Sequence, residues 1–140
     1  MNRMRLEFPA VSQNERFARG VISAFLLELD PTLSELSEVK TAVSEAVTNA
    51  VIHGYRDRSG TVVMESTIAG SVVTVTVTDR GRGIENIEQA MEALYSGSDD
   101  EERSGLGFTI MQSFMDEVEV TSEVGRGTVV TMRKKIGSAG

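Results

Sequence analysis

The chain carries a carboxylate and an amide four residues apart, Glu45 and Asn49. On a helix over residues 41–51, alanines and valines fall on one face and this pair falls on the other as neighbours. An Asn carbonyl is a hard oxygen ligand suited to Mg²⁺ that bridges phosphates, and a carboxylate one turn earlier can deprotonate an attacking hydroxyl. Beyond Lys40 this polar face has no Lys or Arg. The pair therefore predicts the wall of a phosphate-handling site, with an ordinary solvated helix face as the alternative.

A second polar segment, Asp79-Arg80-Gly81-Arg82-Gly83, directly follows a stretch rich in Val and Thr that is typical of a strand. A buried Asp79 could accept a hydrogen bond from an exocyclic amine, which would select adenine over guanine. Gly81 and Gly83 would let the backbone approach a ligand closely. Taken alone, Asp and Gly after a strand indicate only a turn.

Two further segments are candidates for contact with a nucleotide. Ser104-Gly105-Leu106-Gly107 is expected to open a helix, where free backbone amides and the helix dipole favour phosphate, with Arg103 as a candidate γ-phosphate contact. In the turn 125–128, the Thr128 hydroxyl is a candidate support for the adenine or for a bridging water. A flexible helix start and a tight hairpin are the structural alternatives for these two segments.

Composition restricts the chemistry. The 140 residues are 40% hydrophobic and 25% charged, which favours a single compact domain over residues 1–136 with a disordered tail at 137–140. The chain has no Cys and a single histidine, His53. Thiolate catalysis, Cys-based zinc sites and multi-histidine metal sites are therefore excluded within one chain. The P-loop pattern and the complete Rossmann glycine pattern are both missing from the sequence.

The net charge of −7 argues against direct binding to DNA as the main role, because phosphate backbones require clustered Lys and Arg. It does not argue against ATP, whose phosphates can be balanced by backbone amides and a metal ion. No signal segment and no apolar run of about 18 residues is present, so we expect a cytoplasmic protein without a membrane role.

The elements that must position these residues follow from periodicity and turn signals. Strands are expected at 3–8, 61–68, 72–78, 118–122 and 128–134, with the last four forming two hairpins. Helices are expected at 15–29, from Thr32 or Ser34 to His53, at 87–94 and at 107–114, with a mobile acidic loop at 96–102. This order lacks a strand–helix–strand repeat and predicts an α+β sandwich rather than a doubly wound parallel sheet.

The first predicted helix is apolar over more than one stripe. Either it is buried on two sides or part of it, including Ile22, Leu26 or Leu27, faces a second copy or another protein. Arg19 on the same helix and Arg103 are candidate partner contacts, against the alternative of solvated arginines.

In combination, residues 45–54, 79–83, 105–107 and 127–128 resemble the conserved boxes of the GHKL ATPase/kinase superfamily, which includes gyrase, Hsp90, MutL and histidine kinases. The resemblance covers almost the whole chain. It implies the Bergerat fold, a two-layer α/β sandwich with helices on one face of a mixed, largely antiparallel sheet.

Within the superfamily, residues 44–55 and 102–117 look most like small stand-alone anti-sigma factor serine kinases of sporulating bacteria. By that resemblance Glu45 would be the catalytic base, Asn49 the Mg²⁺ ligand and Asp79 the adenine reader. The four glycines 81, 83, 105 and 107 would shape the pocket, and Thr128 would support the base. The short segment before Ser104 would leave the γ-phosphate of ATP accessible to a protein substrate.

The activity that the resemblance implies is transfer of the γ-phosphate to a serine of an anti-anti-sigma protein, by a homodimer that also binds and silences a sigma factor. Two alternatives stay open. The chain could serve a general stress-response sigma factor, or it could be a non-catalytic module in which ATP only gates partner binding. An upstream phosphoacceptor histidine of the histidine-kinase kind is missing, since the single histidine lies inside the first box.

Overall fold

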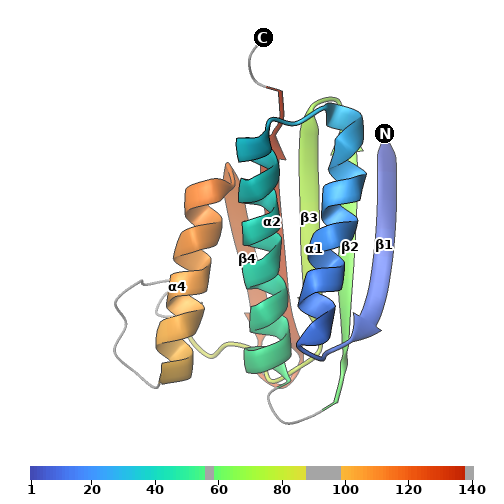
Figure 1. Cartoon of the computed structure of the whole chain (residues 1–140). Coiled ribbons are helices and arrows are strands. Elements are labelled where there is room, and N and C mark those ends of the chain that lie inside the picture. The colour runs from blue at the N-terminus through green and yellow to red at the C-terminus, as the bar shows by residue number, and fades with distance from the viewer. Residues whose placement is uncertain (56–58, 88–98, 138–140) are drawn as a thin grey trace.

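The computed structural model describes residues 1–55, 59–87 and 99–137 and shows two layers, a five-stranded sheet with helices on one face (Figure 1). The sheet has the order β1-β2-β3-β5-β4, and each neighbouring pair is antiparallel. The predicted α+β sandwich is confirmed. In the described strands the sheet is wholly antiparallel, where a mixed sheet was expected. The strands are β1 (Asn2–Pro9), β2 (Thr61–Ala69), β3 (Val72–Asp79), β4 (Glu117–Glu123) and β5 (Gly127–Lys135).

Both predicted hairpins are confirmed to within one residue at each strand end. The β2–β3 turn contains Gly70 at φ 61°, and the β4–β5 turn contains Gly125 at φ 80° and Gly127 at φ 118°. These are left-handed conformations that glycine adopts without steric cost. The register pairs Asp79 with Thr128 at the end of β3, so two predicted site residues lie side by side.

Among the described residues, the helical layer contains α1 (Gln13–Leu26) with the short 3₁₀ turn η1 (Leu27–Leu29), α2 (Leu33–Thr48) and α4 (Asp99–Phe114). Thr32 starts α2 through a capping box: its hydroxyl accepts from the Glu35 N–H at 3.0 Å, and Glu35 accepts from the Thr32 N–H at 2.9 Å. α2 continues into the π-helix η2 (Asn49–Gly54). No helix in the described ranges is long and apolar enough to cross a membrane.

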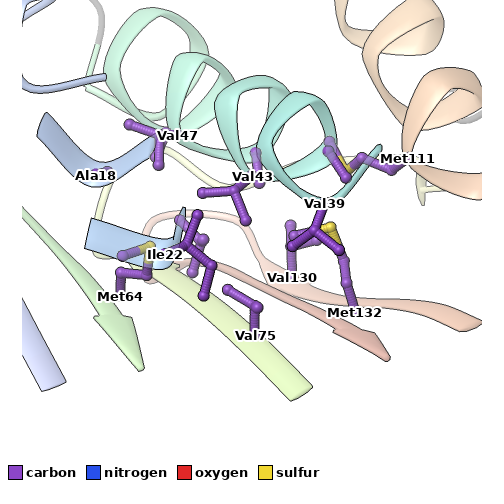
Figure 2. Close-up of a cluster of buried hydrophobic side chains, with 14 of the residues drawn as sticks. Ala18, Ile22, Val39, Val43, Val47, Met64, Val75, Met111, Val130 and Met132 are labelled. Carbon is purple, nitrogen blue, oxygen red and sulfur yellow. The ribbon is translucent and has the colours of Figure 1, made fainter. Parts of the chain in front are cut away.

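The core lies between the two layers, and Figure 2 shows Val39, Val43 and Val47 of α2 at its centre, close to side chains of the sheet. Ile22 and Leu26 of α1 are fully buried in it. The expectation that these two residues face a partner is therefore wrong, because α1 packs against both α2 and the sheet. Leu27, at 65% exposed, remains on the surface.

The last helix begins earlier than the sequence predicted. α4 starts at Asp99, so residues 99–102 are helical and do not belong to a loop, and the segment 104–107 lies inside the helix rather than at its start. Four consecutive acidic residues at 99–102 are favourable near the N-terminal end of a helix because of the helix dipole. Gly105 and Gly107 each lower helix stability by only about 1 kcal/mol relative to alanine. The predicted helix 87–94 and the rest of the acidic loop fall largely outside the described residues.

Of the predicted disordered tail, residues 138–140 lie outside the described part of the chain. Gly137 is tied to the helical layer, since its N–H donates to Glu35 Oε2 at 3.0 Å.

Candidate functional site

The C-terminal part of α2 brings Glu45 and Asn49 against Gly107 of α4. A Cβ on Gly107 would lie 3.1 Å from Glu45 Oε2, 3.3 Å from Asn49 Nδ2 and 3.5 Å from Asn49 Oδ1. The Glu45/Asn49 pair on α2 therefore meets Gly107 of α4, which is far from the pair in sequence, at one point between the two helices. The missing Cβ of Gly107 leaves room directly beside a carboxylate and an amide.

Asn49 stands where the helical winding changes from α to π, a transition that is frequent at functional sites. Its Nδ2 is buried and has no hydrogen-bond partner among the described residues. A buried polar atom without a partner costs about 1–3 kcal/mol. Rotating the amide by 180° would place Oδ1 in the same position. Either orientation points to a polar ligand, and an amide oxygen there suits Mg²⁺ that keeps most of its waters.

In the described part of the chain, no group of three His, Cys, Asp or Glu side chains could hold a metal ion.

Glu45 is half-buried beside α1 and α4. Burial raises the pKa of Glu45, and the negative charge of Glu15 on α1 raises it further. No Lys or Arg is paired with Glu45 among the described residues. A carboxylate with a raised pKa and no paired cation is better suited to accept a proton than an ordinary surface glutamate.

Asp79 ends β3 at the edge of the core and is 6% exposed. Its Oδ1 accepts a hydrogen bond from the Gly81 N–H at 2.9 Å. Burial raises the pKa of Asp79, and the backbone N–H groups of Gly81 and Thr128 partly offset that rise. A carboxylate this well shielded and held at the end of a strand can accept a hydrogen bond from a ligand with little competition from water.

The turn after Asp79 is clamped to the end of η2. The Arg82 N–H donates to the Gly54 carbonyl at 2.8 Å, and Arg82 Nε donates to the His53 carbonyl at 2.8 Å. A Cβ on Gly81 would lie 1.9 Å from the Gly54 oxygen, so glycine is the residue that permits this approach. The helix that carries Glu45 and the turn that carries Asp79 are thereby fixed relative to each other.

Gly83 is held on the opposite side of the same turn. It has φ 76°, and a Cβ there would lie 2.3 Å from the Glu123 oxygen at the end of β4. Gly81 and Gly83 therefore each approach the protein's own backbone closely, whereas their expected approach to a ligand stays a prediction.

Thr128 is 7% exposed, and its hydroxyl is 2.7 Å from Ser122 Oγ. Ser122 Oγ also accepts from the Ile84 N–H at 2.7 Å and donates to the Gly127 carbonyl at 3.0 Å. Because the Ser122 hydroxyl hydrogen is donated to the Gly127 carbonyl, the Thr128 hydroxyl is the donor to Ser122 Oγ. Ser122 was not a predicted site residue, and no local sequence signal marks it.

Two other positioning residues were missed. Gly54 belongs to the segment 45–54 that carries the family resemblance but was given no role of its own, yet a Cβ on it would lie 2.8 Å from Asp79 Cγ and Oδ1. The Tyr55 hydroxyl donates to the Thr61 carbonyl and accepts from the Arg80 N–H, both at 2.7 Å. Their place directly after the Asn49 segment is a signal that could have identified both.

The remaining predicted residues are placed less completely. Helix α4 contains Arg103, Ser104, Gly105 and Leu106. The side chains of residues 99–106 are outside the described part of the chain. Arg19, a candidate partner contact, lies on α1 with its Nε 3.6 Å from Glu15 Oε1 and its side chain 39% exposed.

Comparisons with known proteins identify the family of the chain. Residues 8–134 match the family described as histidine kinase-like ATPase domain. A protein named anti-sigma F factor from Thermoanaerobacter sp. (strain X514) is 53% identical over 137 residues, which are 98% of this chain and 96% of that protein. The anti-sigma F factor of Clostridium perfringens (strain SM101 / Type A) is 54% identical over 98% of this chain and 99% of that one.

Solved structures show the same fold at lower identity. The crystal structure of the RsbU and RsbW domains of Rv1364c from Mycobacterium tuberculosis aligns with a TM-score of 0.71 at 22% identity, over 97% of this chain and 33% of that longer chain. The catalytic domain of the histidine kinase ThkA aligns with a TM-score of 0.59 at 14% identity, over 95% of this chain and 96% of that one. Since the family match spans nearly the whole chain and the curated relatives share more than half of its residues, the chain belongs to the histidine kinase-like ATPase domain family and, within it, to the anti-sigma F factors.

Proposed function

We propose that this chain is an ATP-dependent serine kinase that phosphorylates and inactivates an anti-anti-sigma protein, and that it also binds and inhibits a sporulation sigma factor. The observation that carries the kinase half is the meeting of Glu45, Asn49 and Gly107. It combines a carboxylate of raised pKa with a buried amide that has no partner in the described residues, beside a gap where a Cβ would stand. The names of the relatives support the sigma-factor half.

In this proposal ATP is the phosphoryl donor, and Asp79 accepts a hydrogen bond from its adenine amine. The turn 79–83 and Thr128, with its hydroxyl network, hold that end of the pocket. Asn49 holds Mg²⁺, which would supply charge neutralisation at the phosphates. Arg103 and the backbone of 104–107 are proposed phosphate contacts on the other side.

Glu45 orients the acceptor serine and takes the proton from its hydroxyl as the serine oxygen attacks the γ-phosphorus. A bond forms between that oxygen and phosphorus, and the bond from phosphorus to the β,γ-bridging oxygen breaks. The products are the phosphoserine protein and ADP, with the proton on Glu45. The raised pKa of Glu45 favours this proton acceptance, because a more basic carboxylate is a better general base once it is ionised.

The same chain is proposed to bind the sigma factor as a homodimer in the cytoplasm, with Arg19 and Arg103 as partner contacts. The exposed side of α1 and the 3₁₀ turn η1 that follows it supports a role for this segment in docking, since Phe17 of α1 is 53% exposed and Leu27 of η1 is 65% exposed. A general stress-response sigma factor is the second candidate partner. Anti-sigma F factor names among the relatives favour the sporulation factor.

The test combines the purified chain with ATP, Mg²⁺, a candidate anti-anti-sigma protein and the sigma factor. We expect γ-phosphate to appear on a serine of the anti-anti-sigma protein, and the unphosphorylated protein to release sigma from the chain. ATP binding without any phosphate transfer would overturn the kinase half and favour a nucleotide-gated binding module.

A further inference from the structure

The helix-facing side of the sheet changes from apolar to polar at the end that carries the proposed base-binding turn. The register of β3, β5 and β4 aligns one inward-facing residue from each strand in every row. Two successive rows belong to the core: Val75, Met132 and Val118, followed by Val77, Val130 and Val120. Figure 2 shows Val75, Met132 and Val130 among the core side chains.

The next row of the same three strands is Asp79, Thr128 and Ser122. One carboxyl group and two hydroxyl groups therefore follow directly on two rows of valine and methionine. Asp79 and Thr128 belong to the proposed nucleotide site, whereas Ser122 has no proposed contact with the nucleotide.

Ser122 uses its whole hydrogen-bonding capacity inside the protein. A serine hydroxyl has one hydrogen to donate and two lone pairs that accept. Ser122 Oγ donates to the Gly127 carbonyl at 3.0 Å and accepts from the Ile84 N–H at 2.7 Å. Its second lone pair faces the Thr128 hydroxyl at 2.7 Å. Toward Thr128, Ser122 can therefore act only as an acceptor.

The polarity of Ser122 determines the polarity of Thr128. A threonine hydroxyl also has a single hydrogen, and in Thr128 this hydrogen is directed at Ser122 Oγ. Thr128 Oγ1 can then offer a ligand only its lone pairs. Asp79 in its ionised form is likewise restricted to accepting, and the backbone N–H groups of Gly81 and Thr128 are directed at Asp79 itself. The two side chains thus form a surface of acceptors.

A surface of acceptors discriminates between purine bases by the group at ring position 6. Adenine carries an amine there, which donates hydrogen bonds. Hypoxanthine and guanine carry a carbonyl oxygen, whose lone pairs would face those of Asp79 and Thr128 without a hydrogen between them. A binding site rejects such an analogue strongly, because buried polar groups are left unpaired.

We infer that Ser122 is a positioning residue for base selection: by holding the hydrogen of Thr128 it keeps Thr128 an acceptor, and so strengthens selection of a 6-amino purine over a 6-oxo purine. The inference rests on the proposed function, in which this end of the pocket holds the base. Ser122 acts through Thr128 and does not need to touch the nucleotide. Without the Ser122 hydroxyl, the hydrogen of Thr128 can turn toward the ligand and pair with a carbonyl oxygen.

Ser122→Ala and Ser122→Cys test the inference. Alanine removes the hydroxyl, and cysteine keeps the shape of the side chain while its thiol is only a weak donor and a weak acceptor. Ser122→Thr is the conservative variant, since threonine restores a hydroxyl and suits a strand.

Ser66→Ala is the matched control for loss of a buried hydroxyl. Ser66 of β2 is 1% exposed, and its hydroxyl donates to the Thr74 carbonyl at 2.9 Å. It pairs with Val75, two rows before Asp79, so its removal should affect stability without reaching the base.

The Kd values of ATP and of inosine triphosphate, which carries hypoxanthine, are measured with Mg²⁺ by calorimetric titration, beside urea unfolding of each variant. We expect the unmodified chain to prefer ATP. The ratio of the inosine triphosphate Kd to the ATP Kd should fall about tenfold in Ser122→Ala and about threefold or more in Ser122→Cys. Ser122→Thr and Ser66→Ala should keep the ratio within about twofold, although Ser66→Ala should lose stability as Ser122→Ala does.

The inference is overturned if Ser122→Ala and Ser122→Cys keep the ratio of the unmodified chain. This includes the case in which both nucleotides bind more weakly to the same extent, which a purely structural role of Ser122 would give. If Ser122→Ala does not fold, Ser122→Cys decides. An equal fall of the ratio in Ser66→Ala, or an unmodified chain that binds both nucleotides equally, would overturn the inference as well.

Failure of the proposed function gives a different result. Since the titration involves no phosphate transfer, a chain that selects ATP through Ser122 but phosphorylates no protein would fail as a kinase and leave the inference standing. An unmodified chain that binds neither nucleotide would overturn the proposed function and the inference together.

Discussion

Gly54 lies directly against the carboxyl group of Asp79: a Cβ at position 54 would be 2.8 Å from Asp79 Cγ and Oδ1 and 2.9 Å from Oδ2. The end of the helix that carries Asn49 thus forms one wall around the proposed adenine reader. Asp79 cannot easily turn away, since its Oδ1 is held by the Gly81 N–H. The two halves of the proposed nucleotide site meet at this contact.

Gly54→Ala should damage both the fold and the site. The added methyl group meets a buried, hydrogen-bonded carboxylate, so we expect a loss of about 1–3 kcal/mol in the free energy of unfolding and an ATP Kd at least about tenfold weaker. Urea unfolding and equilibrium ATP binding measure these effects. Gly20→Ala is the control, because its Cβ meets nothing within 4 Å; alanine there should keep ATP affinity and add about 0.5–1 kcal/mol of stability. Equal ATP affinity in both variants would contradict the contact.

Gly107→Ala should separate stability from binding. Its Cβ would stand 3.1 Å from Glu45 Oε2, which is the movable end of a side chain, so the fold can adjust. Replacing glycine by alanine within a helix raises the stability of the helix by about 0.8–1 kcal/mol. We therefore expect unchanged or higher stability together with an ATP Kd raised about tenfold or more in the presence of Mg²⁺. A variant that is both more stable and fully competent for Mg·ATP would show that this gap is not part of the site.

Asn49→Leu should stabilise the chain while removing its Mg²⁺ ligand. Leucine has a similar shape and leaves no buried polar atom without a partner, so the free energy of unfolding in the absence of nucleotide should rise by up to about 1–3 kcal/mol. The stimulation of ATP binding by Mg²⁺ should disappear. Calorimetric titration with ATP, with and without Mg²⁺, checks the second part. An Asn49→Leu protein that still responds to Mg²⁺ like the unmodified chain would place the metal elsewhere.

Asp79→Asn should change how stability depends on pH. Burial raises the pKa of Asp79 in the folded chain above its ordinary value of 3.8. The folded state therefore holds this proton more tightly than the unfolded state, and stability falls as pH rises from the unfolded pKa through the folded one. Asparagine does not titrate, so its stability relative to the unmodified chain should improve as the pH rises from about 4 through the raised pKa of Asp79. Urea unfolding of both proteins across that range tests the sign. The burial effect would be contradicted if the difference in free energy of unfolding between Asp79→Asn and the unmodified chain stayed constant with pH, or if the variant became relatively less stable as the pH rose.

The sequence predicted those parts of the fold that depend on local chemistry. Thr32 was a candidate helix start and forms a capping box with Glu35. The two predicted hairpins are present, and Gly70 and Gly125 adopt the left-handed backbone that their turns need. The Glu45/Asn49 pair was placed correctly on the helix face away from the valines, because helical periodicity alone determines it.

The errors concern properties that local sequence does not contain. The burial of Ile22 and Leu26 depends on α1 packing against two neighbours at once. The helical conformation of residues 99–106 reflects a balance between acids that favour the first part of a helix and glycines that oppose a helix. Gly54 and Ser122 were missed because their roles arise from contacts with residues 25 and 6 positions away, Asp79 and Thr128.

The most direct test of the central proposal is a single-turnover transfer of γ-phosphate from ATP to the anti-anti-sigma protein by the unmodified chain and by Glu45→Gln. Glutamine keeps the size of the side chain but cannot take the serine proton. We expect both proteins to bind Mg·ATP with similar Kd, and the transfer rate of Glu45→Gln to fall by about 10²–10⁴-fold. Transfer at the unmodified rate by Glu45→Gln, with ATP binding intact, would contradict the proposal that Glu45 is the base of a serine kinase.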